Sequence, residues 1–291
     1  MTLSRQDITA LLARHGLRPS RALGQNFVAD PNTVRRIARL AALEPGEPVV
    51  EIGAGLGSLT LALLETGAAV TAVEIDQYLL PVLRAQVEPL GARVVEGDAL
   101  RLDWAELLDG EAPWSLVANL PYNVAVPLVL RVLDEAPAVR RLLVMVQREV
   151  GERLAAGAGD EAYGAVSVKV RYHARARLVG KVPATVFVPR PRVESVLVAL
   201  ERLPEVAVDP GLVPAERLFT VVRAGFAQRR KMLRRSLAGV VRPEAFEAAG
   251  VAPEARAEEL GVEDWGRLVR CDLGLGSLEP PSTPRPSSPS A

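Results

Sequence analysis

Short apolar runs and segments with helical periodicity make up the first half of the chain. Five runs have the length of buried strands and end in turn residues, over residues 49–52, 69–74, 93–95, 115–118 and 141–146. Apolar residues at helical spacing lie before or between them, over residues 34–43, 59–64, 79–83 and 127–135. Strands that alternate with helices through short connections predict an α/β fold with a doubly wound, mostly parallel sheet.

The pattern changes after residue 147. Residues 164–178 alternate between apolar and polar positions, and residues 193–200 have the composition of a further strand. A proline-rich loop joins these two strands, and we expect them to pair antiparallel at the edge of the sheet. Residues 203–213 have the prolines of a linker, and residues 215–273 have helical periodicity. The sequence therefore predicts a Rossmann-like α/β domain (residues 1–203), a small all-α domain (204–275) and a disordered Pro/Ser-rich tail (276–291).

The scarcity of cysteine and histidine limits the chemistry of the chain. With one cysteine, Cys271, and two histidines, neither an internal disulfide nor a Cys/His metal cluster is expected. No run approaches the roughly eighteen apolar residues of a membrane span, and the N-terminal segment carries charges throughout. We therefore expect no membrane span, no signal peptide and a reducing, cytoplasmic setting.

Positive charge is concentrated in two segments, although the 35 basic and 35 acidic residues balance. Residues 162–193 contain seven Lys or Arg and no acid, and residues 217–242 contain eight and no acid. This distribution predicts a polarised molecule with a polyanionic partner. The candidate phosphate contacts are Arg223, Arg229, Arg230, Lys231, Arg234 and Arg235. If residues 226–237 form one helix, its basic residues cover most of the circumference, which a merely solvated basic helix would also show.

A glycine-rich segment, Gly53-x-Gly55-x-Gly57, stands between the first strand and its helix. Glycine lets the backbone approach a ligand closely, and the N-terminus of a helix favours negative charge. The spacing differs from the dinucleotide pattern G-x-G-x-x-G, and no lysine of a Walker-type loop follows. A nucleoside without a pyrophosphate fits better, and S-adenosylmethionine is such a ligand. A tight turn without any ligand is the alternative.

Acidic residues stand at the ends of the next two strands. Glu74 ends the second strand, where a carboxylate can accept hydrogen bonds from both hydroxyls of a ribose. Asp98 follows the third strand, where it can accept from the edge of an adenine. Either acid alone would more often be a solvated strand end. Glycine, Glu74 and Asp98 at three successive strand ends on one edge together predict a nucleoside site.

The segment Asn119-Leu120-Pro121-Tyr122 follows the fourth strand at the same edge. Asn119 offers an amide oxygen, Pro121 restricts the carbonyl of Leu120, and Tyr122 offers a flat aromatic face. The exocyclic amine of a purine or pyrimidine has two N–H donors beside an aromatic plane, so these groups complement it. Two acceptors could localise the lone pair of the amine and aim it at an electrophilic methyl group. A turn with its aromatic packed on the core is the alternative.

Between about residues 20 and 240 the chain resembles the ribosomal RNA adenine dimethylase family of S-adenosylmethionine-dependent methyltransferases. The matching segments are GQNF, VVEIGAGLGSLT, VEID, EGDAL, NLPYN, YG-x-x-SV, VFVPRPRVESVLV and FAQRRKMLRRSL. By this resemblance the cofactor-binding positions are Gln25, Asn26, Val28, Gly53, Gly55, Glu74, Asp98 and Asn119. The catalytic positions are Asn119, Leu120, Pro121 and Tyr122, with Tyr122 stacking on the target base.

The resemblance implies N6-dimethylation of two adjacent adenines in a hairpin loop near the 3′ end of small-subunit rRNA. S-adenosylmethionine would supply the methyl groups, without a metal. We expect a monomer that acts on rRNA within a pre-ribosomal small subunit, with residues 1–203 catalytic and residues 204–275 docking RNA. Two alternatives stay open: a large-subunit rRNA adenine methyltransferase of the antibiotic-resistance type, and a non-catalytic RNA-binding assembly factor.

Overall fold

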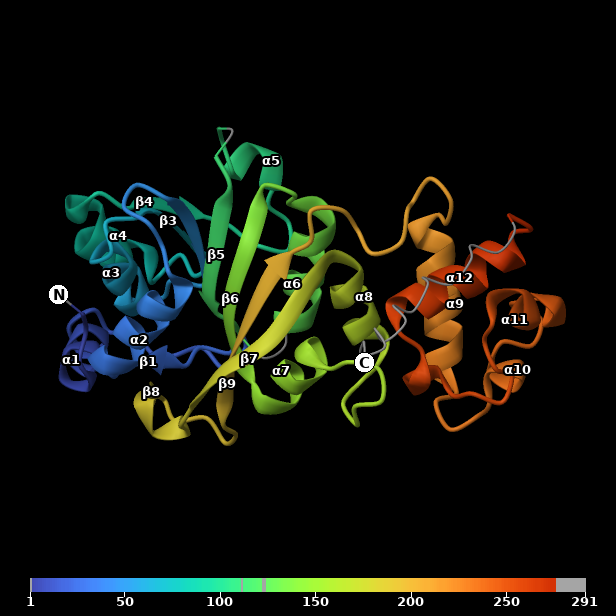
Figure 1. Ribbon diagram of the computed structural model, residues 1–291. Helices are drawn as coiled ribbons and strands as arrows, with labels where there is room; N and C mark the ends of the chain where they lie inside the picture. The colour runs from blue at the N-terminus through green and yellow to red at the C-terminus, as the bar shows by residue number, and fades with distance from the viewer. Residues whose placement is uncertain (1, 111, 122–123, 276–291) are drawn as a thin grey trace, which may run out of the picture. The chain divides into compact units, whose positions relative to one another are not determined.

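The computed structural model describes residues 2–110, 112–121 and 124–275 (Figure 1). The chain divides into two compact units. One, which we call the α/β unit, consists of Met1–Gly157 and Glu161–Glu205. The other, the helical unit, consists of Ala158–Asp160 and the residues from Val206 onward. The predicted tail, residues 276–291, lies outside the described residues.

In the described part of the α/β unit there are nine strands. They are β1 (Phe27–Val28), β2 (Pro48–Ile52), β3 (Ala69–Glu74), β4 (Arg93–Glu96), β5 (Trp114–Asn119), β6 (Val139–Gln147), β7 (Ala174–Val182), β8 (Phe187–Val188) and β9 (Ser195–Arg202). Its helices are α1 (Arg5–Arg14), α2 (Pro31–Ala41), α3 (Ser58–Leu64), α4 (Leu80–Val87), α5 (Trp104–Leu107), α6 (Ala125–Glu135), α7 (Arg148–Ala155) and α8 (Ala165–His173). In the part of the chain that the structure describes, no helix is long and apolar enough to cross a membrane.

Seven of the strands form one large sheet, in the order β4-β3-β2-β5-β6-β9-β7. The strands β4, β3, β2, β5 and β6 are parallel, and β9 runs antiparallel between β6 and β7. The order of the strands reverses between β2 and β5, which is where open α/β sheets bind their ligands. The predicted Rossmann-like, mostly parallel sheet with an antiparallel pair at one edge is confirmed (Figure 1).

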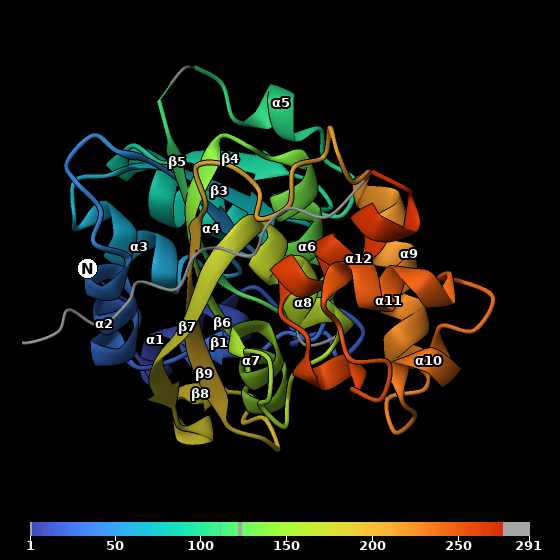
Figure 2. The same ribbon diagram turned by 45° about the vertical axis from the view of Figure 1, so that its right-hand side comes forward.

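Both faces of this sheet are buried, as alternate residues of the strands show. Val49 belongs to a core cluster with α2, α3 and α4, whereas its neighbour Val50 belongs to a second cluster with α6 and α8. Helices accordingly cover both faces of the sheet (Figure 2). A parallel strand buried on both faces must be apolar throughout, which is why the strands appear in the sequence as continuous apolar runs.

The strand expected over residues 164–178 is wrong in its first half, because residues 165–173 form α8 and β7 begins only at Ala174. The alternating valines of this segment favour a strand locally. Tertiary contacts overrule them, since the Ser167 hydroxyl accepts a hydrogen bond from Gly164 N (3.1 Å) and donates to the Arg153 carbonyl (2.6 Å). Val168 and Val170 are fully buried on the helix. The rest of the prediction holds, since β7 pairs antiparallel with β9.

The helical unit contains α9 (Ala215–Ala227), α10 (Leu233–Ser236), α11 (Pro243–Ala249) and α12 (Val262–Asp272). Trp265 of α12 is fully buried against α9, where a Cβ on Gly225 would lie 2.6 Å from the Trp265 ring. The expectation of one helix over residues 226–237 is wrong. Lys231 N donates to the Gln228 carbonyl (2.7 Å) in a turn that separates α9 from α10. The basic residues of this segment therefore lie on two helices and a turn.

Candidate active site

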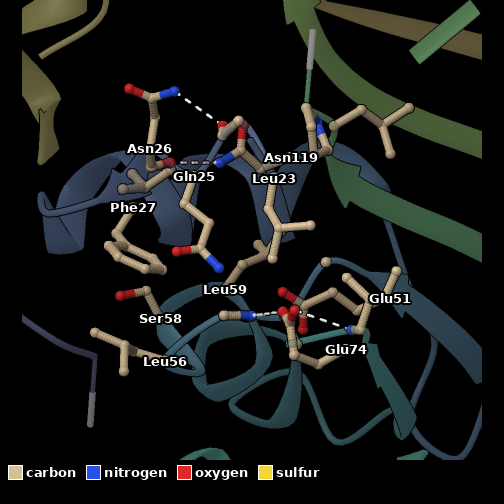
Figure 3. Close-up of a pocket in the computed structure, with 18 residues that line it drawn as sticks. Leu23, Gln25, Asn26, Phe27, Glu51, Leu56, Ser58, Leu59, Glu74 and Asn119 are labelled. Carbon is tan, nitrogen blue, oxygen red and sulfur yellow. Dashed lines mark hydrogen bonds between the residues drawn. The ribbon is translucent and has the colours of Figure 1, made fainter. Parts of the chain in front are cut away.

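A pocket opens at the carboxyl ends of β2, β3 and β5, the edge at which the sequence predicts the site (Figure 3). Its lining comes from four parts of the chain: Leu23–Val28, Glu51–Leu59 without Ile52 and Gly57, Glu74–Ile75, and Asn119–Pro121. These include Gln25, Asn26, Val28, Gly53, Gly55, Glu74 and Asn119, so seven of the eight predicted cofactor-binding residues meet in one pocket.

The glycine-rich turn requires its glycines for two separate reasons. Gly53, Gly55 and Gly57 have φ of 74°, 60° and 88°, a region that residues with a Cβ rarely adopt. A Cβ on Gly55 would also lie 3.0 Å from the ring of Phe27. The turn thus brings bare backbone to the pocket wall, and Phe27 closes over it.

Glu74 organises this turn with its carboxylate. The side chain is only 5% exposed and accepts hydrogen bonds from Gly55 N (2.7 Å), Ile75 N (2.9 Å) and Asp76 N (2.9 Å). Burial is the largest influence on the carboxyl and raises its pKa, while the three backbone donors oppose that shift. A carboxylate has about four acceptor positions, so one position beyond the three backbone donors stays available to a ligand.

Glu51, for which the sequence pattern predicts no role, lies in the floor of the pocket beside Glu74 (Figure 3). It is 2% exposed, and its burial raises the pKa of the carboxyl to about 8; the Thr60 hydroxyl opposes this shift, and the neighbouring Glu74 adds to it. Among the described residues, the Glu51 Oε2 is buried without a hydrogen-bond partner, as is the Ser58 hydroxyl. The signal in the sequence was a lone acid within the apolar run VVEI. A polar, cationic group in the pocket would satisfy this carboxyl.

Residues 23–28, which lead into β1, form the opposite wall of the pocket, and contacts with other parts of the chain hold them in place. Gln25 donates from Nε2 to Asp76 Oδ2 (2.7 Å), and its Oε1 accepts from Ser20 N (2.7 Å). Val28 is buried, with β1 paired antiparallel to β8. These contacts hold the segment against the end of β3.

Asn119, at the end of β5, is joined to the same segment. Its Nδ2 donates to the carbonyl oxygen of Asn26 at 3.0 Å (Figure 3). Because this bond fixes which end of the amide is the donor, Oδ1 is presented as an acceptor. Leu120 follows, buried, with its N–H bound to the Met145 carbonyl (3.0 Å). Pro121 lines the pocket, and the predicted stacking residue Tyr122 lies outside the described residues.

Asp98, the remaining predicted cofactor residue, borders a second hollow beside the first. The two hollows share Leu23, Gly53, Ile75 and Pro121, so they are continuous along the edge of the sheet. Asp98 accepts from Leu100 N (2.9 Å) through Oδ1. Apolar side chains line most of this second hollow, as a flat heterocycle with one polar edge requires.

A comparison with known families decides which class of protein this site belongs to. The family model described as "Ribosomal RNA adenine dimethylase" matches residues 17–271. The chain belongs to this family.

The sequence of this dimethylase matches named relatives over nearly their whole length. "Ribosomal RNA small subunit methyltransferase A" of Kineococcus radiotolerans is 49% identical and covers 97% of this chain and 96% of its own. The protein of the same name from Thermobifida fusca is 50% identical, covering 92% and 95%. These matches establish an S-adenosylmethionine-dependent rRNA adenine dimethyltransferase.

Solved structures give the same picture of the fold. A dimethyladenosine transferase from Plasmodium falciparum superimposes with a TM-score of 0.70 at 23% identity, covering 82% of this chain and 94% of its own. The 23S rRNA methyltransferase ErmE has a TM-score of 0.67 at 28% identity, covering 84% and 99%. The first of these likenesses concerns the fold alone.

The six predicted RNA-binding residues of the dimethylase lie in the helical unit and differ in their surroundings. Arg229 and Arg234 form ion pairs with Glu258 (2.5 Å) and Glu254 (2.8 Å), and Arg223 donates to the Thr220 hydroxyl (3.1 Å). Arg230, Lys231 and Arg235 are exposed. Among the described residues, no group of three or more His, Cys, Asp or Glu side chains could hold a metal ion.

Proposed function

We propose that this dimethylase uses S-adenosylmethionine to convert two adjacent adenines, in a hairpin loop near the 3′ end of small-subunit rRNA, to N6,N6-dimethyladenine. The observation that carries the proposal is the Asn119 amide, which lines the pocket and whose Oδ1 is left as an acceptor because Nδ2 donates to the Asn26 carbonyl. Relatives named for the small subunit are 49% and 50% identical, against 28% for ErmE, which favours the small subunit as substrate.

The pocket residues fit the cofactor in the following way. Gly53 and Gly55 offer close backbone, Glu74 offers its one free acceptor position to a ribose hydroxyl, and Asp98 offers an acceptor to the adenine edge. Gln25, Asn26 and Val28 close the opposite wall. The buried Glu51 Oε2, which lacks a hydrogen-bond partner among the described residues, suits the positive charge of the cofactor's methionyl part. When bound, the cofactor supplies a methyl group activated by the sulfonium.

The target amine is held by the segment that follows β5. An adenine N6 is a weak nucleophile because its lone pair is delocalised into the ring. For the first methyl group, the Asn119 Oδ1 and the carbonyl of Leu120 would each accept one N6 hydrogen, which localises the lone pair and aims it at the methyl group. For the second, the singly methylated amine has one hydrogen left for these acceptors, and N6 would release one proton in each transfer. The bond from Leu120 N to Met145 and the ring of Pro121 fix that carbonyl before the substrate arrives. Tyr122 stacks on the extruded base.

We assign RNA docking to the helical unit through Arg223, Arg229, Arg230, Lys231, Arg234 and Arg235. An adenine in a loop is poorly stacked, so its extrusion costs only a few kcal/mol. We further propose that the enzyme acts as a cytoplasmic monomer on a pre-ribosomal small subunit.

The test is methylation of isolated ribosomal subunits from cells that lack the modification, with labelled S-adenosylmethionine and mass spectrometry of the rRNA. We expect dimethyladenine at two adjacent positions of the small-subunit rRNA. Labelling of the large subunit would instead support the ErmE-like alternative. RNA binding without labelling of either subunit would support an assembly factor without catalysis.

A further inference from the structure

Three arginines of the α/β unit, Arg21, Arg190 and Arg192, belong to segments that border the pocket and have no role in the site described above. Arg21 is at the tip of a turn closed by two bonds between Ser20 and Gln25, one from Gln25 N to Ser20 O (3.0 Å) and one from Ser20 N to Gln25 Oε1 (2.7 Å). Gln25 itself lines the pocket, and Leu23 of the same turn lines both hollows. Arg21 therefore belongs to the turn that supplies this wall of the pocket.

Arg190 and Arg192 belong to the loop of residues 189–194, both ends of which are attached at the same edge of the sheet. At its start, Val188 pairs with Phe27, which lines the pocket. At its end, Ser195 pairs with Gln147 at the carboxyl end of β6. β6 is parallel to β5, and its residue Met145 pairs with Asn119, so the carboxyl ends of the two strands lie at the same edge of the sheet. The loop therefore ends at the edge that carries Asn119.

The side chains of these three arginines are available to a ligand. Each is exposed, and within the described residues none of the three guanidinium groups forms a hydrogen bond or an ion pair. Many other arginines of the α/β unit are paired, for example Arg35 with Glu65 (2.9 Å) and Arg141 with Glu47 (2.5 Å). The one acid of the loop, Glu194, lies 3.9 Å from Arg148. Three uncompensated cations thus gather at the mouth of a pocket that takes a nucleotide base.

We propose that Arg21, Arg190 and Arg192, the rim arginines, bind backbone phosphates of the single-stranded rRNA on either side of the extruded adenine. The inference rests on the proposed function and adds a second RNA-binding surface, on the α/β unit, to the basic residues of the helical unit. An extruded base leaves its own phosphates at the pocket mouth, and guanidinium groups bind phosphate in a bidentate manner. Bound there, the rim arginines fix which nucleotide of the loop enters the pocket.

The test compares the full-length enzyme with a triple variant, Arg21→Ala, Arg190→Ala and Arg192→Ala. The probe is a synthetic RNA hairpin with the 3′-terminal small-subunit sequence and two adjacent loop adenines. We expect the KM for this RNA to rise about tenfold or more, with cofactor affinity and melting temperature unchanged.

The salt dependence of RNA binding is the second readout. Each lost contact with a single-strand phosphate reduces the magnitude of the slope of log K against log salt by about 0.7, so we expect the slope of the triple variant to be smaller by about 2. Lysine at the three positions should restore most of the salt slope, because a lysine also binds phosphate as a point charge.

The matched control is Arg39→Ala, Arg140→Ala and Arg175→Ala, three exposed arginines near the amino ends of the strands. This variant should keep the wild-type KM and salt slope. A wild-type salt slope in the rim variant, or an equal loss in the control, would overturn the inference. Weaker cofactor binding or a lower melting temperature in the rim variant would also overturn it, because the arginines would then be structural. If the wild-type enzyme binds the hairpin with the rim-dependent slope but methylates neither the hairpin nor isolated small subunits that lack the modification, the rim stands and the proposed function fails.

Discussion

Asn119 and Asn26 are 93 residues apart in the sequence, yet the Nδ2 of the first donates to the backbone carbonyl of the second at 3.0 Å. The bond ties the end of β5 to the segment that enters β1. It also orients the amide so that Oδ1 is left to accept a hydrogen bond from a donor in the pocket. The pocket wall around Asn26 and the end of β5 are therefore one connected structure.

Replacement of Asn119 tests this connection. Asn119→Ala should lower kcat for rRNA methylation by about 100- to 1000-fold, the usual effect of removing one positioned polar group. RNA binding, measured by filter retention, should change little. Asn119→Asp keeps the acceptor but sets a carboxylate oxygen against the Asn26 carbonyl, so it should also be poorly active. Methylation at the wild-type rate in either variant would remove the role given to Asn119.

Gly55→Ala separates backbone strain from the contact with Phe27. The substitution places a Cβ at φ 60° and 3.0 Å from the Phe27 ring. Gly46→Ala is the control, since Gly46 has φ 79° and nothing within 4 Å of its Cβ position. Both variants should lose about 1–2 kcal/mol of unfolding free energy. Titration calorimetry should show weaker cofactor binding only for Gly55→Ala; equal cofactor affinity in the two variants would contradict the account of the turn.

Glu51 should make stability fall as the pH rises. Its pKa is raised to about 8 in the folded state from an ordinary value of 4.5, so between these values the folded protein retains a proton that the unfolded chain has released. The free energy of unfolding therefore decreases, by up to about 1.4 kcal/mol per pH unit across this window. Glu51→Gln removes the contribution. Urea denaturation from pH 5 to 8 should show a flatter profile for Glu51→Gln, and parallel profiles would refute the assignment.

Cofactor binding should reverse this dependence. A cationic ligand next to Glu51 favours the ionised carboxyl, so the affinity for S-adenosylmethionine should rise with pH up to about 8. In Glu51→Gln the affinity should be lower and nearly independent of pH. The measurement is fluorescence or calorimetric titration at a series of pH values, and a pH-dependent affinity unchanged by the substitution would exclude Glu51 as the cause.

Glu74→Gln tests the carboxylate that holds the turn. An amide has one oxygen, so it cannot accept from Gly55 N on one side and from Ile75 and Asp76 on the other. The buried N–H left without an acceptor should cost about 1–3 kcal/mol, and cofactor binding should be lost. Glu96→Gln, at the exposed end of the neighbouring strand, is the control and should behave as the wild type. Unchanged cofactor affinity in Glu74→Gln would show that the turn does not depend on this carboxylate.

The sequence by itself determined the class of fold and most of the pocket. Continuous apolar runs fixed the parallel strands, because strands buried on both faces admit few polar residues. Residues at the carboxyl ends of parallel strands must meet at one edge of the sheet, so the sequence predicts that Gly53, Glu74 and Asn119 lie together.

Only the tertiary structure decided the features that depend on contacts distant in sequence. The valines of α8 alternate as in a strand, but Ser167 and the core around Val170 hold them in a helix. That the Glu51 Oε2 is buried without a hydrogen-bond partner among the described residues depends on the side chains that pack around it, which the sequence does not give. Pairing of β1 with β8 brings Arg190 to the mouth of the pocket across more than 160 residues. Local patterns report which face of an element is buried, whereas burial of a single polar group and the meeting of distant loops depend on how the whole chain packs.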